Sequence, residues 1–164
     1  MLIYLKNKDS LVIEDFIFKC CIGKNGVKKD KVEGDKSTPK GKFSITELYY
    51  RDDRVAKPNT SIKKKIINRN MGWCDDAYHK LYNKEILVNK FIHHEKLHRK
   101  DNKYDYLLVL NYNRNKIVPN KGSAIFLHIA KRNYKPTKGC VAITKKNILL
   151  IAGIINKKTK IIIA

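Results

Sequence analysis

Short runs of β-branched and aromatic residues, separated by breaks that contain glycine or proline, most constrain the fold of this chain. Such runs are typical of strands, because these side chains pack well on a pleated surface. One break, at 34–43, is predicted to be a loop, and another, at 118–123, a turn. Strands are predicted at 2–6, 11–23, 42–50, 104–112, 123–130, 141–144 and 158–164. The pattern therefore predicts a mainly β (α+β) fold.

One segment near the C-terminus has the period of an amphipathic helix. Its apolar residues predict a helix over 145–155, with the hydroxyl of Thr144 as its N-terminal cap. Residues 51–103 are different, because they are polar with scattered aromatic residues and show no clear period. We interpret them as a long irregular insertion with a functional role. The length suits a single domain, residues 1–164, with its own core.

The net charge of +21 limits the class of partner. A strongly basic surface attracts nucleic acid, anionic lipid or an acidic polymer. However, 30 of the 36 basic residues are lysine, whereas dedicated nucleic-acid binders rely on arginine for base edges and bidentate phosphate contacts. Nucleic acid is therefore not the expected partner, although a non-catalytic basic nucleic-acid-binding module stays open as an alternative. An anionic substrate would be attracted.

The cysteines and the N-terminus bear on the cellular compartment. Cys20, Cys21, Cys74 and Cys140 form no CxxC pair, zinc knuckle or disulfide framework, and the adjacent Cys20 and Cys21 are expected on opposite faces of a strand. The N-terminus lacks the parts of a secretion signal, and no apolar run approaches the length of a membrane span. We expect no transmembrane segment and, on the sequence as given, a cytoplasmic location.

The segment HIAKRNYKPTKGCVAIT, residues 128–144, carries the candidate reactive groups. In a strand over 123–130, His128 shares a face with Phe126 and lies near the strand end, while the other face is apolar. Cys140 follows after a loop of eleven residues, which is long enough to return it to the same strand end. A thiol and an imidazole placed together are the parts of a cysteine peptidase or acyltransferase.

The residues around the cysteine favour that chemistry. The cations of Arg132, Lys135 and Lys138 are expected to favour the thiolate, which is the nucleophilic form. Gly139 permits a tight turn, and the N–H groups of Gly139 and Cys140 could form an oxyanion hole. From the residues alone a second interpretation stays open, in which Cys140 is a small buried hydrophobe and the histidine a hydrogen-bonded structural residue.

The same segment resembles the signature of the L,D-transpeptidase catalytic domain (YkuD) family. That signature is a histidine, a variable loop, Ser or Thr, a residue that is usually His, then Gly-Cys and a hydrophobic residue, which here are His128, Thr137, Lys138, Gly139, Cys140 and Val141. GDKSTPKGKFSI resembles the family's G-x-x-x-T-P-x-G-x-F segment. GWCDDAYHKLYNKEI, HHEKLHRKDNKYDYLLVLNYN and GSAIFLHIA resemble compact single-domain members. The resemblance runs from about Gly34 to the C-terminus.

The resemblance implies a mixed β-sandwich whose Cys-His pair lies in a groove, and acyl transfer on anionic peptidoglycan stem peptides. It implies that Cys140 attacks the carbonyl of the third stem residue, a diamino acid. His128 would take the thiol proton and pass it to the leaving D-Ala. The thioester would go to an amine of another stem, giving a 3-3 cross-link, or to water, as in an L,D-carboxypeptidase.

The family pattern also assigns the neighbouring residues. It implies that Gly139, Thr137 and Lys138 lie on the oxyanion and substrate-binding side, and it implies no cofactor and no metal. Two residues depart from the pattern, since Lys138 stands where His is usual and Ala142 stands where Arg or Asn is common. These departures bear on donor binding and acceptor choice. Most of the family is exported, which would place the protein in the periplasm or cell wall.

A rival motif is HEKLH, residues 94–98, which fits H-E-x-x-H. On a helix it would direct His94 and His98 to zinc, with Glu95 as the general base of a metallopeptidase. The flanking sequence leaves room for only a short helix, and no further ligand follows at a recognisable spacing. In the resembling family this stretch usually reads H-E-x-L-W-R, so His98 replaces Trp. His94, Glu95 and Trp73 are then candidates to line the groove.

Overall fold

The computed structural model describes all 164 residues, Met1–Ala164. Strands dominate it, with one α-helix and one short 3-10 helix. In chain order the elements are β1 (Leu2–Leu5), β2 (Ser10–Ile13), β3 (Phe16–Lys19), β4 (Val27–Lys28), β5 (Thr38–Pro39), β6 (Gly41–Tyr50), β7 (Lys63–Ile66), β8 (Met71–Cys74), β9 (Glu85–Leu87), β10 (His94–Lys96), β11 (Tyr106–Leu110), β12 (Phe126–Ile129), η1 (Arg132–Tyr134), β13 (Val141–Ile143), α1 (Lys145–Ile154) and β14 (Lys160–Ile163). The mainly β fold with one C-terminal helix is confirmed.

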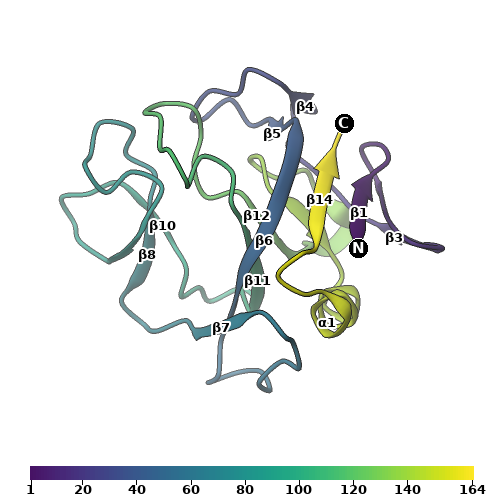
Figure 1. Cartoon of the computed structure of the whole chain (residues 1–164). Coiled ribbons are helices and arrows are strands. Elements are labelled where there is room, and N and C mark those ends of the chain that lie inside the picture. Colours follow the sequence, from purple (N-terminus) through teal and green to yellow (C-terminus); the bar gives the residue numbers. More distant parts are fainter.

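The largest sheet has nine strands and mixed directions (Figure 1). Its order is β13-β12-β11-β6-β14-β1-β2-β3, with β7 beside β6. A bridge joins its two ends, because the N–H of Cys21 donates to the carbonyl of Ala142 at 2.9 Å and the reverse bond is 2.8 Å. The sheet therefore curls around an interior and leaves few open edges.

The interior holds the larger of two hydrophobic clusters, with 25 buried residues. Helix α1 packs there through Ile148, Ile151 and Ala152. The cap is formed as expected, since the Thr144 hydroxyl accepts a hydrogen bond from the N–H of Asn147 at 3.2 Å. No helix has the length and apolar character needed to span a membrane.

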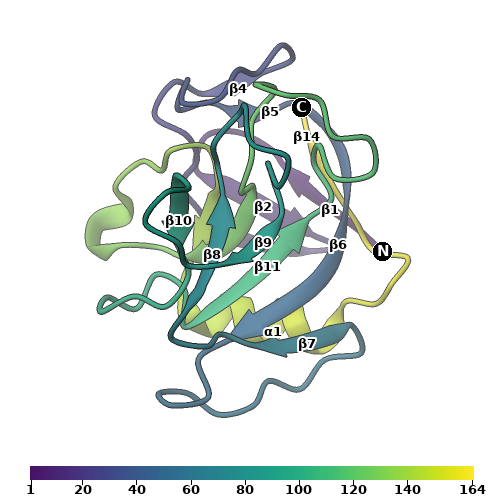
Figure 2. The ribbon, with the colours of Figure 1, turned by 90° about the vertical axis from the view of Figure 1, so that its left-hand side faces the viewer.

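A second, smaller layer covers the outer face of the main sheet at β6, β11 and β12 (Figure 2). It is a three-stranded sheet in the order β10-β8-β9, and ten buried residues fill the space beneath it. The rings of Trp73 and Phe126 meet edge to face, 5.0 Å apart. The expectation of an irregular segment over 51–103 is thus wrong in part. Strands of three or four residues are too short to produce a visible period.

The N-terminal stretch 11–23 also differs from expectation, because it is a hairpin and not one strand. Strands β2 and β3 pair antiparallel around a turn in which Glu14 has a left-handed φ of 51°. Cys20 and Cys21 follow β3 and are both buried. Only the acidic pair Glu14-Asp15 marked the turn, and it carries neither glycine nor proline.

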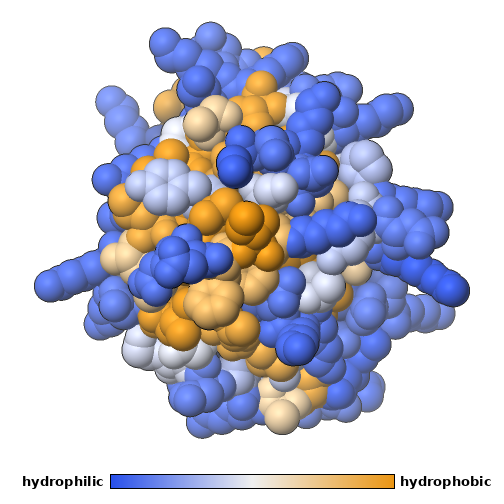
Figure 3. All heavy atoms as spheres, turned by 90° about the vertical axis from the view of Figure 1, so that its right-hand side faces the viewer, coloured by the Kyte–Doolittle hydropathy of each residue, from blue (hydrophilic) through white to orange (hydrophobic).

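The outer face of the main sheet is not covered everywhere. Tyr4, Val12, Ile17 and Ile162 are cross-strand neighbours on β1, β2, β3 and β14. The side chains of Tyr4 and Ile17 are 43% and 66% exposed. Figure 3 shows apolar side chains gathered on this side of the molecule. The second layer therefore protects only the half of the sheet that bears the candidate site.

Candidate active site

Strand β12 positions His128 between two neighbours, with Leu107 of β11 on one side and Ala142 of β13 on the other. The alternation along β12 is as predicted. Leu127 and Ile129 face the interior cluster, while Phe126 lies in the cluster under the second layer. His128 shares that outer face and is only 2% exposed.

The hydrogen bonds of His128 define its tautomer. Its Nδ1 lies 2.9 Å from the carbonyl oxygen of Ile129, which can only accept, so Nδ1 carries the hydrogen. The other nitrogen, Nε2, is buried and has no hydrogen-bond partner. The ring of Tyr104 packs edge to face on the imidazole, with centroids 5.5 Å apart. His128 therefore presents a fixed ring with an unused acceptor.

The environment keeps this imidazole neutral. Burial, and then the nearby charge of Lys103, lower the pKa of His128 to about 3. At neutral pH the ring is uncharged, and Nε2 is available to take a proton. A neutral imidazole with an unpartnered nitrogen can accept a proton, and a pKa this far below neutral makes it a weak base in the resting state.

Cys140 is held at the entry to β13 by the segment that leads into β12. Its Sγ donates to the carbonyl oxygen of Ala124 at 3.2 Å and accepts from the N–H of Phe126 at 3.4 Å. Ala124 has a left-handed φ of 51°, a conformation that costs an alanine about 1 kcal/mol or more. The backbone is thus strained at the point where it contacts the thiol.

Burial raises the pKa of the Cys140 thiol, while Lys103 and the N–H of Phe126 act in the opposite direction. The expectation that Arg132, Lys135 and Lys138 favour the Cys140 thiolate is therefore wrong. These three side chains are exposed, and water screens their charges. The resting pair is a neutral thiol and a neutral imidazole.

Gly139 and Thr137 shape the turn before the cysteine. The Thr137 hydroxyl donates to the carbonyl of Cys140 at 2.6 Å and accepts from the N–H of Gly139 at 3.0 Å. Gly139 has a φ of +143°, and a Cβ there would lie 2.8 Å from the carbonyl oxygen of Ser37. Because the N–H of Gly139 is occupied, the expected oxyanion hole reduces to the N–H of Cys140, which donates to no backbone carbonyl.

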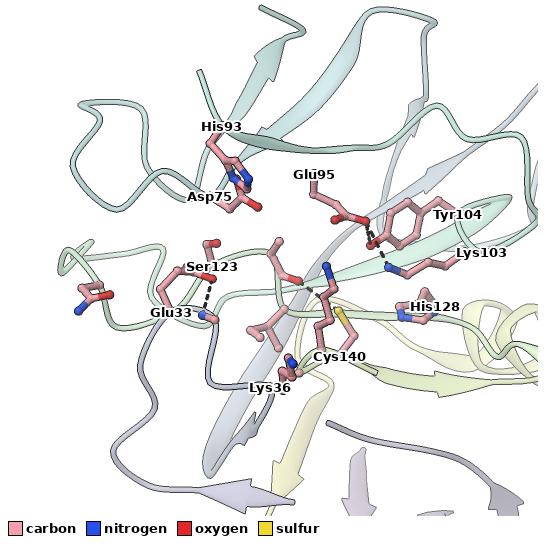
Figure 4. Close-up of a pocket in the computed structure, with 16 residues that line it drawn as sticks. Glu33, Lys36, Asp75, His93, Glu95, Lys103, Tyr104, Ser123, His128 and Cys140 are labelled. Atoms are coloured by element: carbon pink, nitrogen blue, oxygen red, sulfur yellow. Dashed lines mark hydrogen bonds and ion pairs between the residues drawn. The ribbon is translucent and has the colours of Figure 1, made fainter. Parts of the chain in front are cut away.

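A cavity of about 380 Å³ brings these groups together (Figure 4). Cys140, His128, Gly139, Lys138 and Glu95 all line it. A second cavity of about 340 Å³ is also lined by Lys138, Glu95 and His128, and in addition by Thr137. Two expected groove residues lie outside both cavities: Trp73 is 1% exposed beneath the second layer, and His94 pairs with Cys74.

The sequence of this chain matches the family model of the L,D-transpeptidase catalytic domain (YkuD) over residues 1–163. This chain belongs to the YkuD family. The match extends to the N-terminal hairpin, beyond the part that the motifs covered. Members of the family are enzymes with L,D-transpeptidase-type chemistry, which cross-links peptidoglycan, and they act on its stem peptides. A search of curated proteins found no match.

Glu95 of this YkuD domain lines the cavity as an anion that is already neutralised. Its Oε1 accepts from the Tyr104 hydroxyl at 3.0 Å, from Lys103 Nζ at 3.2 Å and from Arg99 at 3.4 Å. Burial acts to raise the pKa of Glu95, but the charge of Lys103 and these bonds outweigh it and hold the pKa below its ordinary value. Glu95 therefore organises Lys103 and Tyr104 near His128.

The helix that a zinc site at residues 94–98 requires does not form. His94, Glu95 and Lys96 make up β10, which pairs with β8. His94 Nδ1 lies 2.6 Å from the carbonyl of Ile92, and His98 lies 3.7 Å from Asp53. No group of three or more His, Cys, Asp or Glu side chains is arranged to hold a metal ion. The i, i+4 spacing of His94 and His98 places two side chains together only on a helix, and residues 94–96 form a strand instead.

Several residues of the cavity were not found from the sequence. They are Glu33, Asp75, His93, Lys103, Tyr104 and Ser123. They come from five separate segments, and neither spacing nor periodicity linked them to Cys140.

Proposed function

We propose that this YkuD domain catalyses cysteine-dependent acyl transfer on peptidoglycan stem peptides through a thioester on Cys140. The observation that carries the proposal is the unpartnered, buried Nε2 of neutral His128 in the same cavity as the thiol. His94 Nε2 is likewise buried and unpartnered, but His94 lines neither cavity, so the shared cavity with Cys140 is what distinguishes His128. An orphaned nitrogen beside a nucleophile suits a proton acceptor.

In the acylation step, the Cys140 sulfur bonds to the carbonyl carbon of the third stem residue while His128 Nε2 takes the thiol proton. The oxyanion that forms accepts a hydrogen bond from the N–H of Cys140. As the intermediate collapses, the bond to D-Ala breaks, and the proton on Nε2 passes to the leaving amine. Because both groups start neutral, proton transfer accompanies attack, and no thiolate has to be maintained in a buried site.

In the second step an amine of another stem, or water, attacks the thioester. His128 Nε2 takes the proton of the attacking group, the carbon–sulfur bond breaks, and that proton passes from Nε2 to the leaving sulfur, which regenerates the thiol. An amine gives the 3-3 cross-link of an L,D-transpeptidase, and water gives an L,D-carboxypeptidase. Both outcomes use the same acyl-enzyme, so the products distinguish them.

A carbapenem and intact mass spectrometry test the nucleophile. The four cysteines are free, so peptide mapping must locate the adduct. We expect one adduct on Cys140 in the unmodified protein, none in Cys140→Ala, and an unchanged adduct in Cys74→Ala, which removes another buried thiol. An adduct of equal yield in folded Cys140→Ala would overturn the proposal.

Product analysis then tests the reaction. Purified protein is incubated with a disaccharide-tetrapeptide, and the products are separated by mass. Tripeptide monomer alone indicates hydrolysis, and a cross-linked dimer indicates transpeptidation. Unchanged substrate in the presence of a protein that carbapenem does acylate would contradict the assignment of stem peptides as substrate.

A further inference from the structure

Two carboxylates in the cavity lack the Lys or Arg partner that other enclosed acids of this chain have. The part-buried Asp35, Glu47, Glu85 and Asp105 each form an ion pair with Lys or Arg, and so does Glu95. Glu33 forms none, and Asp75 contacts only His93. With 36 basic residues against 15 acidic ones, two acids in one cavity without a Lys or Arg partner need an explanation.

The contacts of these two acids fix the positions of their carboxyl groups. Glu33 accepts from the hydroxyl of Tyr82 and, at 3.3 Å, from the N–H of Gly34. Asp75 meets His93 through Oδ1 only, so Oδ2 stays free. Burial, opposed by His93, and the charge of Glu33 leave the pKa of Asp75 above its ordinary value. Mutual repulsion of this kind is relieved by a cation.

A buried hydroxyl marks the same end of the cavity. Ser123 is only 7% exposed, and its Oγ has no hydrogen-bond partner. The neighbouring Tyr82 hydroxyl already donates to Glu33 and accepts from the N–H of Gly122. Of the four buried polar atoms without a partner, only those of Ser123 and His128 belong to residues that line this cavity, so the hydroxyl is available to a ligand group. Ser123 is thus an observation independent of the two acids.

Figure 4 shows where this end lies relative to the reactive sulfur. Cys140 lies between Glu33 and Asp75 on one side and His128 on the other. The leaving amine must lie toward His128, because that residue returns the proton. The rest of the acylated residue then extends from Cys140 toward Glu33, Asp75 and Ser123.

We propose that Glu33, Asp75 and Ser123 form a subsite for the side-chain ammonium of the diamino acid whose carbonyl is attacked. The assignment rests on the proposed function. An ammonium has three N–H donors, which match two carboxylates and one hydroxyl oxygen. Lys36 and Lys138 also line the cavity, but their side chains are exposed and reach solvent. The subsite selects stems that keep a free amine on the third residue.

Equilibrium binding to Cys140→Ala tests the subsite without turnover. The probes are a stem tetrapeptide with lysine as its third residue and the same peptide with the ε-amine acetylated. We expect the acetylated peptide to bind about tenfold more weakly, because a hydrogen bond from a charged group in a part-buried site contributes roughly that much to affinity. Equal affinity for the two peptides would overturn the proposal.

Variants locate the preference in the named residues. In the Cys140→Ala background, Glu33→Gln with Asp75→Asn keeps the side-chain shapes and should bring the two affinities within about twofold. Asp76→Asn makes the same change on the adjacent residue, which does not line the cavity, and should keep the full preference. A preference that survives the double substitution would assign the ammonium to another site and refute this one.

The same measurements separate this inference from the proposed function. If the protein with Cys140 intact forms no thioester from either peptide while Cys140→Ala still prefers the free amine, the subsite stands and the catalytic assignment fails. If both peptides form the thioester at equal rates and bind equally, the catalytic assignment stands and the subsite fails. Thermal unfolding of each variant confirms that it is folded.

Discussion

The carbonyl oxygen of Ile129 lies 2.9 Å from Nδ1 of His128, its neighbour along β12. This bond comes from the chain itself, so it persists in any state in which β12 is paired. It places the hydrogen on Nδ1 and leaves Nε2 as the free acceptor of a ring that lines the same cavity as Cys140. The tautomer of the proposed base is therefore set by the backbone, whereas many bases depend on a carboxylate for this.

The low pKa of His128 predicts acid sensitivity. Its pKa of about 3 in the folded state lies below the ordinary 6.5, so the unfolded chain binds the proton more readily. The contribution of neutral His128 to the free energy of unfolding is complete above pH 6.5. It is lost as the pH falls toward 3, with a slope of up to about 1.4 kcal/mol per pH unit. Urea unfolding of the protein and of His128→Gln between these pH values measures it. Equal slopes would show that the histidine is charged or exposed when folded.

The neutral resting pair predicts the pH dependence of acylation. His128 is deprotonated above about pH 3 and Cys140 stays protonated past its ordinary pKa, so the reactive form predominates between about pH 5 and 8. The second-order rate constant for carbapenem acylation should therefore be flat over that range. Stopped-flow or timed mass spectrometry measures it. A rise with a midpoint near 6.5 would instead indicate an ordinary histidine.

Gly139 should not tolerate a side chain. Alanine there combines a φ of +143° with a Cβ 2.8 Å from the carbonyl oxygen of Ser37, so Gly139→Ala should lose about 2 kcal/mol or more of unfolding free energy. Gly153→Ala in α1 is the matched control, because nothing lies within 4 Å of its added Cβ and it should gain about 0.5–1 kcal/mol. Denaturant unfolding compares them, and equal stability would refute the tight turn.

Lys103 should act on the thiol through its charge. It is the charged group that most lowers the pKa of Cys140, and its Nζ lies 4.4 Å from the centroid of the Tyr104 ring. Lys103→Gln should raise the pKa of the Cys140 thiol and slow its alkylation by iodoacetamide at pH 8, because only the thiolate reacts. Lys135→Gln, an exposed cation of the second cavity, should leave the rate within about twofold. Equal slowing in both variants would point to a general charge effect.

The sequence predicted those elements whose pattern is local. The helix after Thr144 and the central strand that carries His128 show their period within a few residues, and both are present. The hairpin around Glu14 and the strands of the second layer were missed. The hairpin was missed because its turn carries neither glycine nor proline. The second layer is positioned by partners far along the chain, as with β8, where Trp73 is buried against Phe126. Three-residue strands carry too little pattern to be seen alone.

The amino-acid sequence by itself determined the kinds of group present, a thiol after glycine and an imidazole twelve positions earlier, and the family to which they belong. It could not determine their protonation states. Those follow from desolvation and from charges such as Lys103, which arrive from other strands only when the second layer closes over β12. Tertiary structure also placed Glu33, Asp75 and Ser123 at one end of the cavity, because segments distant in the chain meet only after the sheet has curled.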